Sequence, residues 1–251
     1  MRLSYAFDRS SSHLHAKAPE SMIVGSGLLA KAFSSSFALD DSILVFASGV
    51  SNSSEHRGFE FARERDMLRA ALNGSHQTVY FSSCAVANPN QPATPYFSHK
   101  REMERLVIKS NGIVFRLPQV VGKSTNPNTL TNFLFDRIRT GEPFDLWTGV
   151  ERNLIDIDDV AIIATTLIRR GLVTPGATES IAAPRSVTMQ EIVNVFEDVL
   201  GKKASYAPME KHLAFPIESE LCQAVARELG IQFNDSYLRN LIAKYYPSAD
   251  A

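Results

Sequence analysis

A tyrosine and a lysine four residues apart, Tyr96 and Lys100, form the pair in this sequence best suited to proton transfer. On a helix they share one face and stand a single turn apart. A phenol ionises at about pH 10 in water, too high for a catalyst of proton transfer at neutral pH, and a neighbouring ammonium stabilises the phenolate. We therefore expect Lys100 to lower the pKa of Tyr96 and to make Tyr96 a general acid/base.

The segments around this pair predict where it lies. A buried strand is predicted over residues 79–83 and ends in small hydroxyl residues. A loop marked by Pro89, Pro92 and Pro95 follows, and the next helix opens near Tyr96. The spacing by itself is equally typical of an exposed helix face, so the interpretation depends on this context.

A Gly-x-Gly-x-x-Ala turn covers residues 25–30 and follows a short strand predicted over 21–24. Its glycines leave room for a phosphate to approach backbone N–H groups at the start of a helix. The motif predicts dinucleotide binding, with an ordinary strand–helix turn as the alternative. The acidic residue that normally holds the adenosine ribose is missing, because Asp40 and Asp41 precede the next strand, 42–47, and only Ala-Ser-Gly follows it.

Strands alternate with helices along the first two-thirds of the chain, which predicts an α/β fold with a parallel sheet covered on both faces. Ligands bind such sheets at the carboxyl ends of the strands, where Gly25, Ala47, Ser83 and Pro118 lie. Further strands are predicted over 112–117, 154–157 and 179–183. Helices are predicted over 55–72, with its Arg, Glu and Asp residues as a solvated face, and near 96–110, 130–140, 158–170, 188–200, 218–229 and 235–246. Residues 141–152 read as irregular.

The totals restrict the class of protein. The chain has 251 residues, 44% of them hydrophobic, and a formal net charge of -1, so we expect neither nucleic acid nor a membrane as a partner. No apolar run reaches the ~18 residues of a membrane span, and the first twenty residues lack the apolar segment of a secretory signal. Cys84 and Cys222 show no metal-ligand spacing. We expect a cytoplasmic protein without a metal.

The ordered motifs of this chain resemble those of the extended short-chain dehydrogenases/reductases, in the NAD-dependent epimerase/dehydratase family that acts on nucleotide sugars. They are IVGSGLLAKAF, VFASG, VYFSSCAV, PYFSHKREME, FRLPQVVG and RNLIDIDDVA. The resemblance implies a Rossmann-like, doubly wound sheet, bound NAD or NADP, and a small, mostly helical C-terminal lobe that holds a nucleoside-diphosphate sugar. It divides the chain into an arm (1–20), a cofactor-binding core (21–122 plus 151–183) and a substrate lobe (123–150 plus 184–251).

The resemblance also implies roles for individual residues. Tyr96 is the acid/base, and Lys100 lowers its pKa while it binds the nicotinamide ribose. Gln119 lies near the substrate, and Arg152 contacts the diphosphate, an anion that suits a guanidinium; a surface arginine is the alternative. The other residues implied in cofactor binding are Gly25, Ser26, Gly27, Leu28, Ala47, Ser48, Gly49, Pro118 and Val120.

The chain departs from the family at its catalytic Ser or Thr, the third residue of the pattern Ser-Ser-[Ser/Thr], which is Cys84 here. A thiol is a weaker hydrogen-bond donor than a hydroxyl. Ser83 replaces it if the strand end is shifted by one residue, although alternation turns Ser83 to the other face. Cys84 is either part of the catalytic site or a small core residue.

A second departure lies between Phe37 and Ser42, where the family has a further strand, a helix and another strand, and this sequence has almost nothing. If both strands are absent, the first strand becomes an edge of the sheet unless another segment covers it. Those elements form the adenosine pocket, so their loss bears on cofactor binding.

Two classes of function follow. The first is an NAD(P)-dependent reductase or epimerase of a nucleoside-diphosphate sugar, with 4-keto reduction and Tyr96 as proton donor preferred; Ala85 and Val86 stand where dehydratases carry acids. The alternative is a non-catalytic binding or regulatory protein of the same fold with impaired cofactor binding. The resemblance also suggests a homodimer formed through the helices at 55–72 and 96–110.

Overall fold

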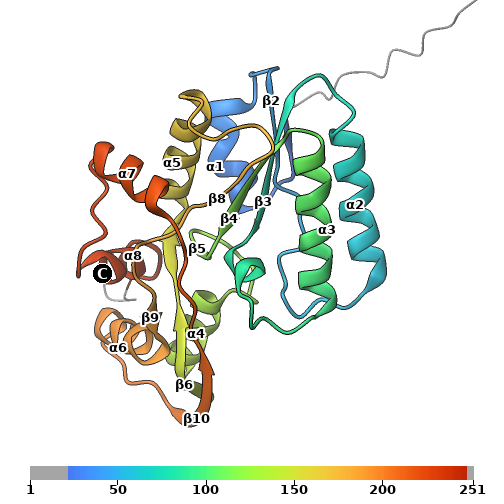
Figure 1. Ribbon diagram of the computed structural model, residues 1–251. Coiled ribbons are helices and arrows are strands. Elements are labelled where there is room, and N and C mark those ends of the chain that lie inside the picture. Colours follow the sequence, from blue (N-terminus) through green and yellow to red (C-terminus); the bar gives the residue numbers. More distant parts are fainter. Residues whose placement is uncertain (1–21, 248–251) are drawn as a thin grey trace, which may run out of the picture.

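A five-stranded parallel sheet forms the centre of the computed structural model, which describes residues 22–247 (Figure 1). Its strands stand in the order β1-β2-β3-β4-β8. They are β1 (Ile23–Val24), β2 (Ile43–Phe46), β3 (Gln77–Ser83), β4 (Ile113–Leu117) and β8 (Thr178–Ser180). The arm predicted over residues 1–20 lies outside the described residues.

Helices cover both faces of this sheet (Figure 1). Side chains alternate along β3, so that Val79 and Phe81 face one core while Tyr80 faces the other. One face carries α1 (Leu28–Phe37), α5 (Ile157–Arg169) and α7 (Glu220–Glu228). The other face carries α2 (Gly58–Ala71) and α3 (Pro95–Lys109). The predicted Rossmann-like α/β class is confirmed.

The sheet lacks the reversal of strand order that dinucleotide-binding folds of this type usually have. After α1 the chain enters β2, which pairs directly with β1, so the two strands predicted to be missing are absent from the described residues. The connection through α1 lies on the face opposite to α2 and α3, although all three run in the same direction across the sheet. The connection from β1 through α1 to β2 therefore has the opposite hand to the connections through α2 and α3. Such connections between parallel strands are right-handed in about 98% of cases.

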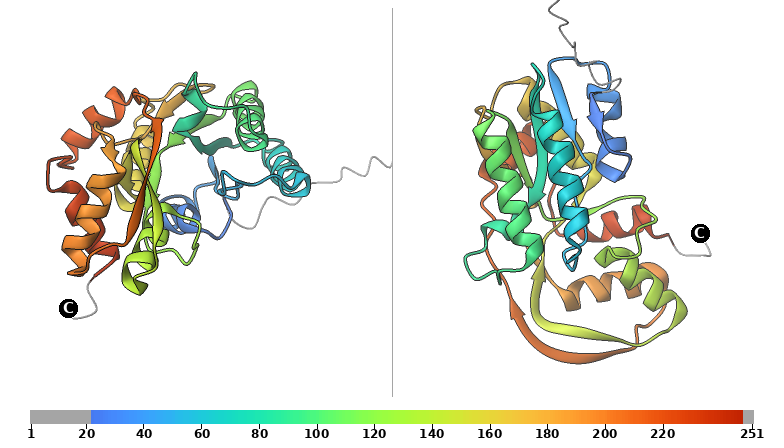
Figure 2. Two further views of the ribbon diagram at one scale, coloured as in Figure 1. Left: turned by 90° about the horizontal axis from the view of Figure 1, so that it is seen from below. Right: turned by 90° about the vertical axis from the view of Figure 1, so that its right-hand side faces the viewer.

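A second, mostly helical lobe lies below the sheet in Figure 1 and has its own core. A short parallel pair, β5 (Gln119–Val121) and β7 (Leu154–Asp156), leads into it. Its helices are α4 (Leu130–Thr140), α6 (Met189–Leu200) and α8 (Tyr237–Tyr245), and its strands are β6 (Phe144–Arg152), β9 (Val187–Thr188) and β10 (Tyr206–Leu213). In Figure 2, β6 and β10 run side by side as a curved ribbon.

The irregular structure predicted over 141–152 is wrong, because β6 occupies most of that range. Its alternation is interrupted: Phe144, Leu146 and Val150 are buried, but the residues between Leu146 and Val150 are exposed, and Gly149 has a φ of +74°. Strand β10 is exposed along nearly its whole length. Both strands form because they pair with each other across a long separation in sequence. Neither has the alternation of apolar and polar residues that would predict a strand.

The ends of α5 and α6 are determined by residues next to them in the sequence. Thr188 and Glu191 form a capping box at the start of α6, and Gly201 ends it in the left-handed conformation. At α5 the N-cap is Asp156, and Asp158 and Asp159 lie in the first turn. The Asp159 carboxylate accepts a hydrogen bond of 2.6 Å from Tyr237. No helix of residues 22–247 is both long and apolar enough to cross a membrane.

Candidate active site

Tyr96 and Lys100 lie on the sheet-facing side of α3, as the spacing predicted. Neighbouring residues fix the start of this helix: Pro95 occupies its first turn, and the Thr94 side chain accepts a hydrogen bond from the backbone N–H of Phe97. Only 6% of Tyr96 and 3% of Lys100 is exposed. The two residues therefore belong to one buried face, and the interpretation as an exposed helix face is wrong.

The Lys100 ammonium contacts a carboxylate that the sequence analysis placed on a solvated face. Lys100 Nζ donates hydrogen bonds to Glu64 Oε1 at 3.1 Å and to the Tyr80 hydroxyl at 2.9 Å. It lies 5.9 Å from the centre of the Tyr96 ring. Glu64 is completely buried. The positive charge of Lys100 is thus paired with the Glu64 carboxylate of α2, and its contact with Tyr96 is with the aromatic ring.

The expected lowering of the Tyr96 pKa is not found. Burial, and then the charge of Glu64, raise the pKa of Tyr96 above its ordinary value. Burial lowers the pKa of Lys100, and the nearby Glu64 opposes this change. At neutral pH Tyr96 is therefore a protonated phenol, a state that can donate a proton but cannot accept one.

The glycine turn and the loop after β2 meet at the carboxyl edge of the sheet, as predicted. Gly25 has a φ of +129°, and a Cβ there would lie 2.5 Å from the carbonyl oxygen of Ala47. A Cβ on Gly49 would lie 2.8 Å from Lys100 Nζ. The turn at 25–28, the loop at 47–49 and Lys100 are therefore contiguous.

Ser83 is the last residue of β3, and Cys84 is the first residue of the short 3₁₀ helix that follows, η1 (Cys84–Ala87). Cys84 is buried, and burial raises its pKa to about 12, against the opposing charge of Arg116. The thiol is therefore protonated at neutral pH. The Ser83 hydroxyl accepts a hydrogen bond from the Ala85 N–H. Within residues 22–247 no hydrogen bond joins either side chain to Tyr96.

The residues predicted to hold substrate lie on the β5–β7 pair and beside it: Gln119 begins β5, and Arg152 ends β6, two residues before β7. Gln119 is exposed, and its backbone N–H donates to the Asn153 carbonyl at 3.0 Å. Pro118 and Val120, on either side of it, are half-buried. Arg152 is also half-buried; it donates to the Glu151 carbonyl at 3.1 Å, and burial lowers its pKa. No ion pair engages Arg152 among the described residues, so its charge is available to an anion.

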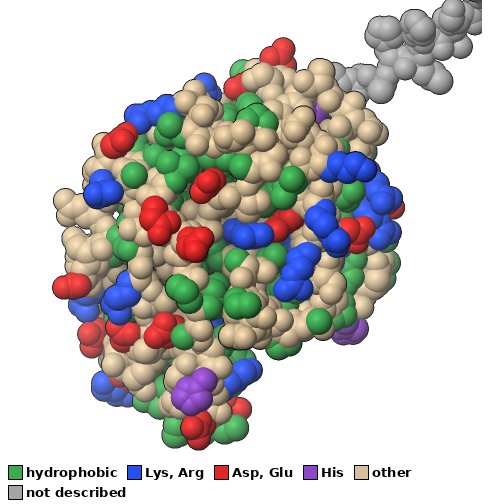
Figure 3. All heavy atoms as spheres, viewed as in Figure 1, with side chains coloured by type: hydrophobic (Ala, Val, Ile, Leu, Met, Phe, Trp, Pro, Cys, Tyr) green, Lys and Arg blue, Asp and Glu red, His purple; other side chains and the backbone are tan. Residues whose placement is uncertain are grey.

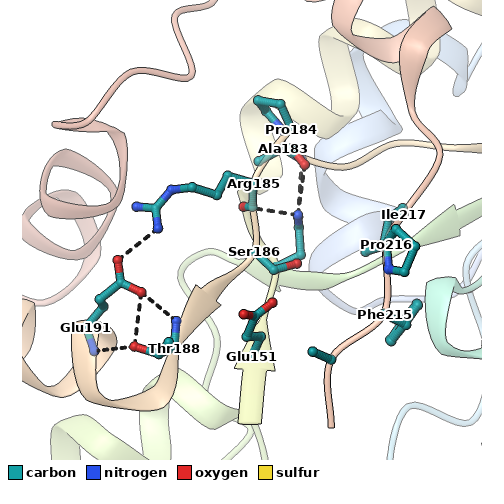
Figure 4. A pocket seen from close by; sticks show the side chains of 12 residues that line it. Glu151, Ala183, Pro184, Arg185, Ser186, Thr188, Glu191, Phe215, Pro216 and Ile217 are labelled. Carbon is teal, nitrogen blue, oxygen red and sulfur yellow. Dashed lines mark hydrogen bonds and ion pairs between the residues drawn. The ribbon is translucent and has the colours of Figure 1, made fainter. Parts of the chain in front are cut away.

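A cavity of about 730 Å³ opens beside this pair, where the sheet and the lobe meet (Figure 4). Glu151 and Asn153 come from the segment next to Arg152, and the opposite wall is formed by residues 214–217. On the remaining side, Arg185 forms an ion pair of 2.8 Å with Glu191. Tyr96, Lys100 and Cys84 do not line the cavity, so its walls and the Tyr96–Lys100 pair are separate features.

Sequence reasoning missed Glu64 and Tyr80. Glu64, Leu68 and Ala71 form the buried stripe of α2, and this spacing of four and three residues marks Glu64 as a core position. The charged composition of that helix concealed it. Its predicted start was also early, because α2 begins at Gly58. No group of three potential metal ligands occurs within residues 22–247.

The fold and the site together define a Rossmann-like α/β protein that carries Tyr96 and Lys100 on one buried helix face. The family model of the NAD dependent epimerase/dehydratase family matches residues 32–177, more than half of the chain. The chain belongs to this family, and the resemblance predicted from the motifs is confirmed. The match begins after the glycine turn.

Solved structures confirm the fold. UDP-glucuronic acid 4-epimerase from Bacillus cereus, in complex with UDP-glucuronic acid and NAD, has a TM-score of 0.64 at 14% identity, covering 82% of this chain and 74% of that one. The dTDP-glucose 4,6-dehydratase from Bacillus anthracis, in complex with NAD, has a TM-score of 0.62 at 15% identity, with 81% and 72% covered.

A third structure covers more of both chains. RMD from Pseudomonas aeruginosa, complexed with NADPH, has a TM-score of 0.60 at 14% identity and covers 88% of this chain and 87% of that one. A comparison with curated protein sequences gives no match.

Proposed function

We propose that the protein is an NAD(P)-dependent oxidoreductase/epimerase acting on a nucleoside-diphosphate sugar, most specifically a 4-keto reductase in which Tyr96 donates the proton. The observation that carries this proposal is the Tyr96–Lys100 pair, buried on one face of α3 beside the loop that follows β2. Family membership supports it. So do the similar structures, whose names describe enzymes of UDP- and dTDP-linked sugars bound to NAD.

The residues present fit part of a dinucleotide. The turn at 25–28 has no side chain within 4 Å of a Cβ built on Gly27, and Gly27 caps α1 without a side-chain hydrogen bond, so backbone N–H groups can face a phosphate. Residues 47–49, Pro118 and Val120 would line the remainder. A carboxylate for the adenosine ribose is absent from the end of β2. When bound, the nicotinamide group would supply a hydride for the keto carbon.

The protonation of Tyr96 favours reduction over a reaction that starts with oxidation. A reductase begins with a phenol that gives its proton to the developing alkoxide, whereas an epimerase begins with a base that removes a proton. Burial and Glu64 keep Tyr96 protonated at neutral pH. Tyr96 is therefore set up as a donor, and the phenolate formed in each turnover takes a proton back from solvent.

The cavity between sheet and lobe is the proposed place for the base, at the end of the nucleotide sugar that lies away from the keto carbon. Its volume of about 730 Å³ is in the range of ~300–1,000 Å³ that small-molecule pockets occupy. Glu151 and Glu191 give its wall acceptors for hydroxyl or amide donors, and they disfavour a diphosphate there. Arg152 and Gln119, next to the cavity, are the proposed diphosphate contacts.

Two observations favour the alternative, a binding or regulatory protein without turnover. The described sheet has no strand order reversal, so the adenosine half of a dinucleotide lacks its usual support. In addition, Glu64 and Tyr80 occupy two hydrogen bonds of Lys100. Both would weaken cofactor binding and leave the fold intact.

Fluorescence titration with NADH and NADPH, followed by a panel of 4-keto nucleotide sugars, tests the two proposals. Cofactor binding with substrate-dependent oxidation of the nicotinamide, lost in Tyr96→Phe, supports the reductase. Cofactor binding unchanged in Tyr96→Phe is the matched control for folding. An absence of binding at millimolar cofactor supports the non-catalytic alternative.

A homodimer is a further proposal. Helices α2 and α3 pack side by side on one face of the sheet, and Figure 3 shows Lys and Arg side chains gathered there among acidic ones. Arg65 and Glu102, one on each helix, approach to 4.0 Å. A dimer through this surface would use charged contacts and weaken with salt, which sedimentation at low and high ionic strength can measure.

A further inference from the structure

The Glu64 carboxylate is the centre of a buried polar cluster between α2, α3 and the sheet. It has no exposed surface. Its Oε2 accepts the backbone N–H of Val50 at 2.6 Å, and its Oε1 accepts the Tyr80 hydroxyl at 2.7 Å and Lys100 Nζ at 3.1 Å. His99 Nε2 lies 3.0 Å from Oε2. A buried carboxylate with this number of donors is held in one position.

Glu64 is charged in this cluster. Burial opposes its ionisation, but the contact with His99, the charge of Lys100 and the bond from Val50 prevail and lower its pKa to about 2. The other charged groups nearby are Glu104, one turn beyond Lys100, and Arg116 on β4, and these two form their own bidentate pair. Glu64 and Lys100 are thus each other's counter-ions.

The same carboxylate connects the Tyr96–Lys100 pair to the loop after β2. Val50 N donates to Glu64, and Gly49, the preceding residue, approaches Lys100 so closely that a side chain there would lie 2.8 Å from Nζ. Glu64 therefore fixes both the ammonium and the loop that borders the proposed cofactor site.

We propose that Glu64 is a positioning residue: it holds the Lys100 ammonium against the Tyr80 hydroxyl, so that within residues 22–247 Lys100 forms no hydrogen bond with the Tyr96 hydroxyl. The inference rests on the proposed function only where it assigns proton transfer to Tyr96. The placement of Lys100 is a property of the chain alone. Release of Lys100 from Glu64 would leave the positive charge free to stabilise the Tyr96 phenolate and would lower the pKa of Tyr96.

The test is a titration of tyrosinate by ultraviolet difference absorbance, without cofactor or substrate. The Tyr96 signal is the difference between a protein and the same protein carrying Tyr96→Phe. In Glu64→Gln, which removes the charge and keeps the shape, we expect the Tyr96 midpoint to fall by at least about one pH unit, a tenfold rise in its acid constant. Glu104→Gln is the matched control, because it removes another buried carboxylate of the same region, one that is paired with Arg116 and not with Lys100; we expect a smaller shift.

A second variant guards against loss of folding. Glu64→Asp keeps the charge but shortens the reach to Lys100, so we expect an intermediate shift, and circular dichroism establishes that each variant is folded. An unchanged or higher Tyr96 midpoint in folded Glu64→Gln, or an equal shift in Glu104→Gln, overturns the inference. Failure of the wild-type protein to bind NADH or NADPH overturns the proposed function alone, because the titration needs neither.

Discussion

Glu64 contributes to the loss of stability expected at acid pH. Its folded pKa is about 2, against an ordinary value of 4.5. This difference corresponds to about 3 kcal/mol of folding free energy at neutral pH, at ~1.36 kcal/mol for each pH unit. Because the folded pKa is depressed, this stabilisation is complete above the unfolded pKa and is lost as the pH falls toward 2. Glu64→Gln imitates the protonated carboxyl and should be less stable than wild type by about 3 kcal/mol at pH 7.

Urea denaturation followed by circular dichroism measures this effect at a series of pH values from 7 to 3. The stability gap between wild type and Glu64→Gln should be constant down to about pH 4.5 and then narrow, by up to ~1.36 kcal/mol for each pH unit. Tyr80→Phe is the control, because it removes a hydrogen bond of 2.7 Å to Glu64 and leaves the carboxylate in place, so its gap should change less with pH. A gap for Glu64→Gln that is independent of pH refutes the reasoning.

Three further substitutions test the fold. Gly25→Ala should destabilise the protein by more than about 1 kcal/mol and abolish cofactor binding, because its Cβ would meet the Ala47 carbonyl; thermal unfolding and the fluorescence titration measure both, and unchanged binding contradicts the role of the turn. Thr188→Ala removes the cap of α6 and should lower the free energy of unfolding by about 1 kcal/mol. An unchanged free energy of unfolding in urea denaturation contradicts this prediction. Phe196→Ala, at a fully buried position of the lobe core, should lower the free energy of unfolding by roughly 3–5 kcal/mol. A much smaller decrease would mean that neighbouring side chains fill the space left by the ring.

Local patterns predicted the elements that bury a continuous apolar face. The strands over residues 79–83 and 112–117 lie within β3 and around β4, and α6 lies within the helix predicted over 188–200. The Tyr96–Lys100 spacing located the site because a helix places both side chains on one face whatever surrounds it. The short connection after Phe37 likewise predicted the missing strands.

The electrostatics of the site depend on Glu64, which lies on another helix and which the local pattern around Tyr96 and Lys100 does not reveal. Tyr96 and Lys100 predicted a lowered pKa only if nothing else paired with the ammonium. Glu64 lies 36 positions before Lys100, and only the packing of α2 against α3 brings the two together. Strands β6 and β10 escaped prediction for the same reason, since each is defined by its partner.

The most direct test of the proposed reaction is the destination of the hydride. The protein is incubated with a 4-keto nucleotide sugar and NADH or NADPH deuterated at the transferable position, and the product is examined by NMR. The proposed function predicts deuterium bonded to carbon 4 of the sugar, with none transferred by Tyr96→Phe. Cofactor that is bound but never oxidised, or equal transfer by Tyr96→Phe, would contradict it.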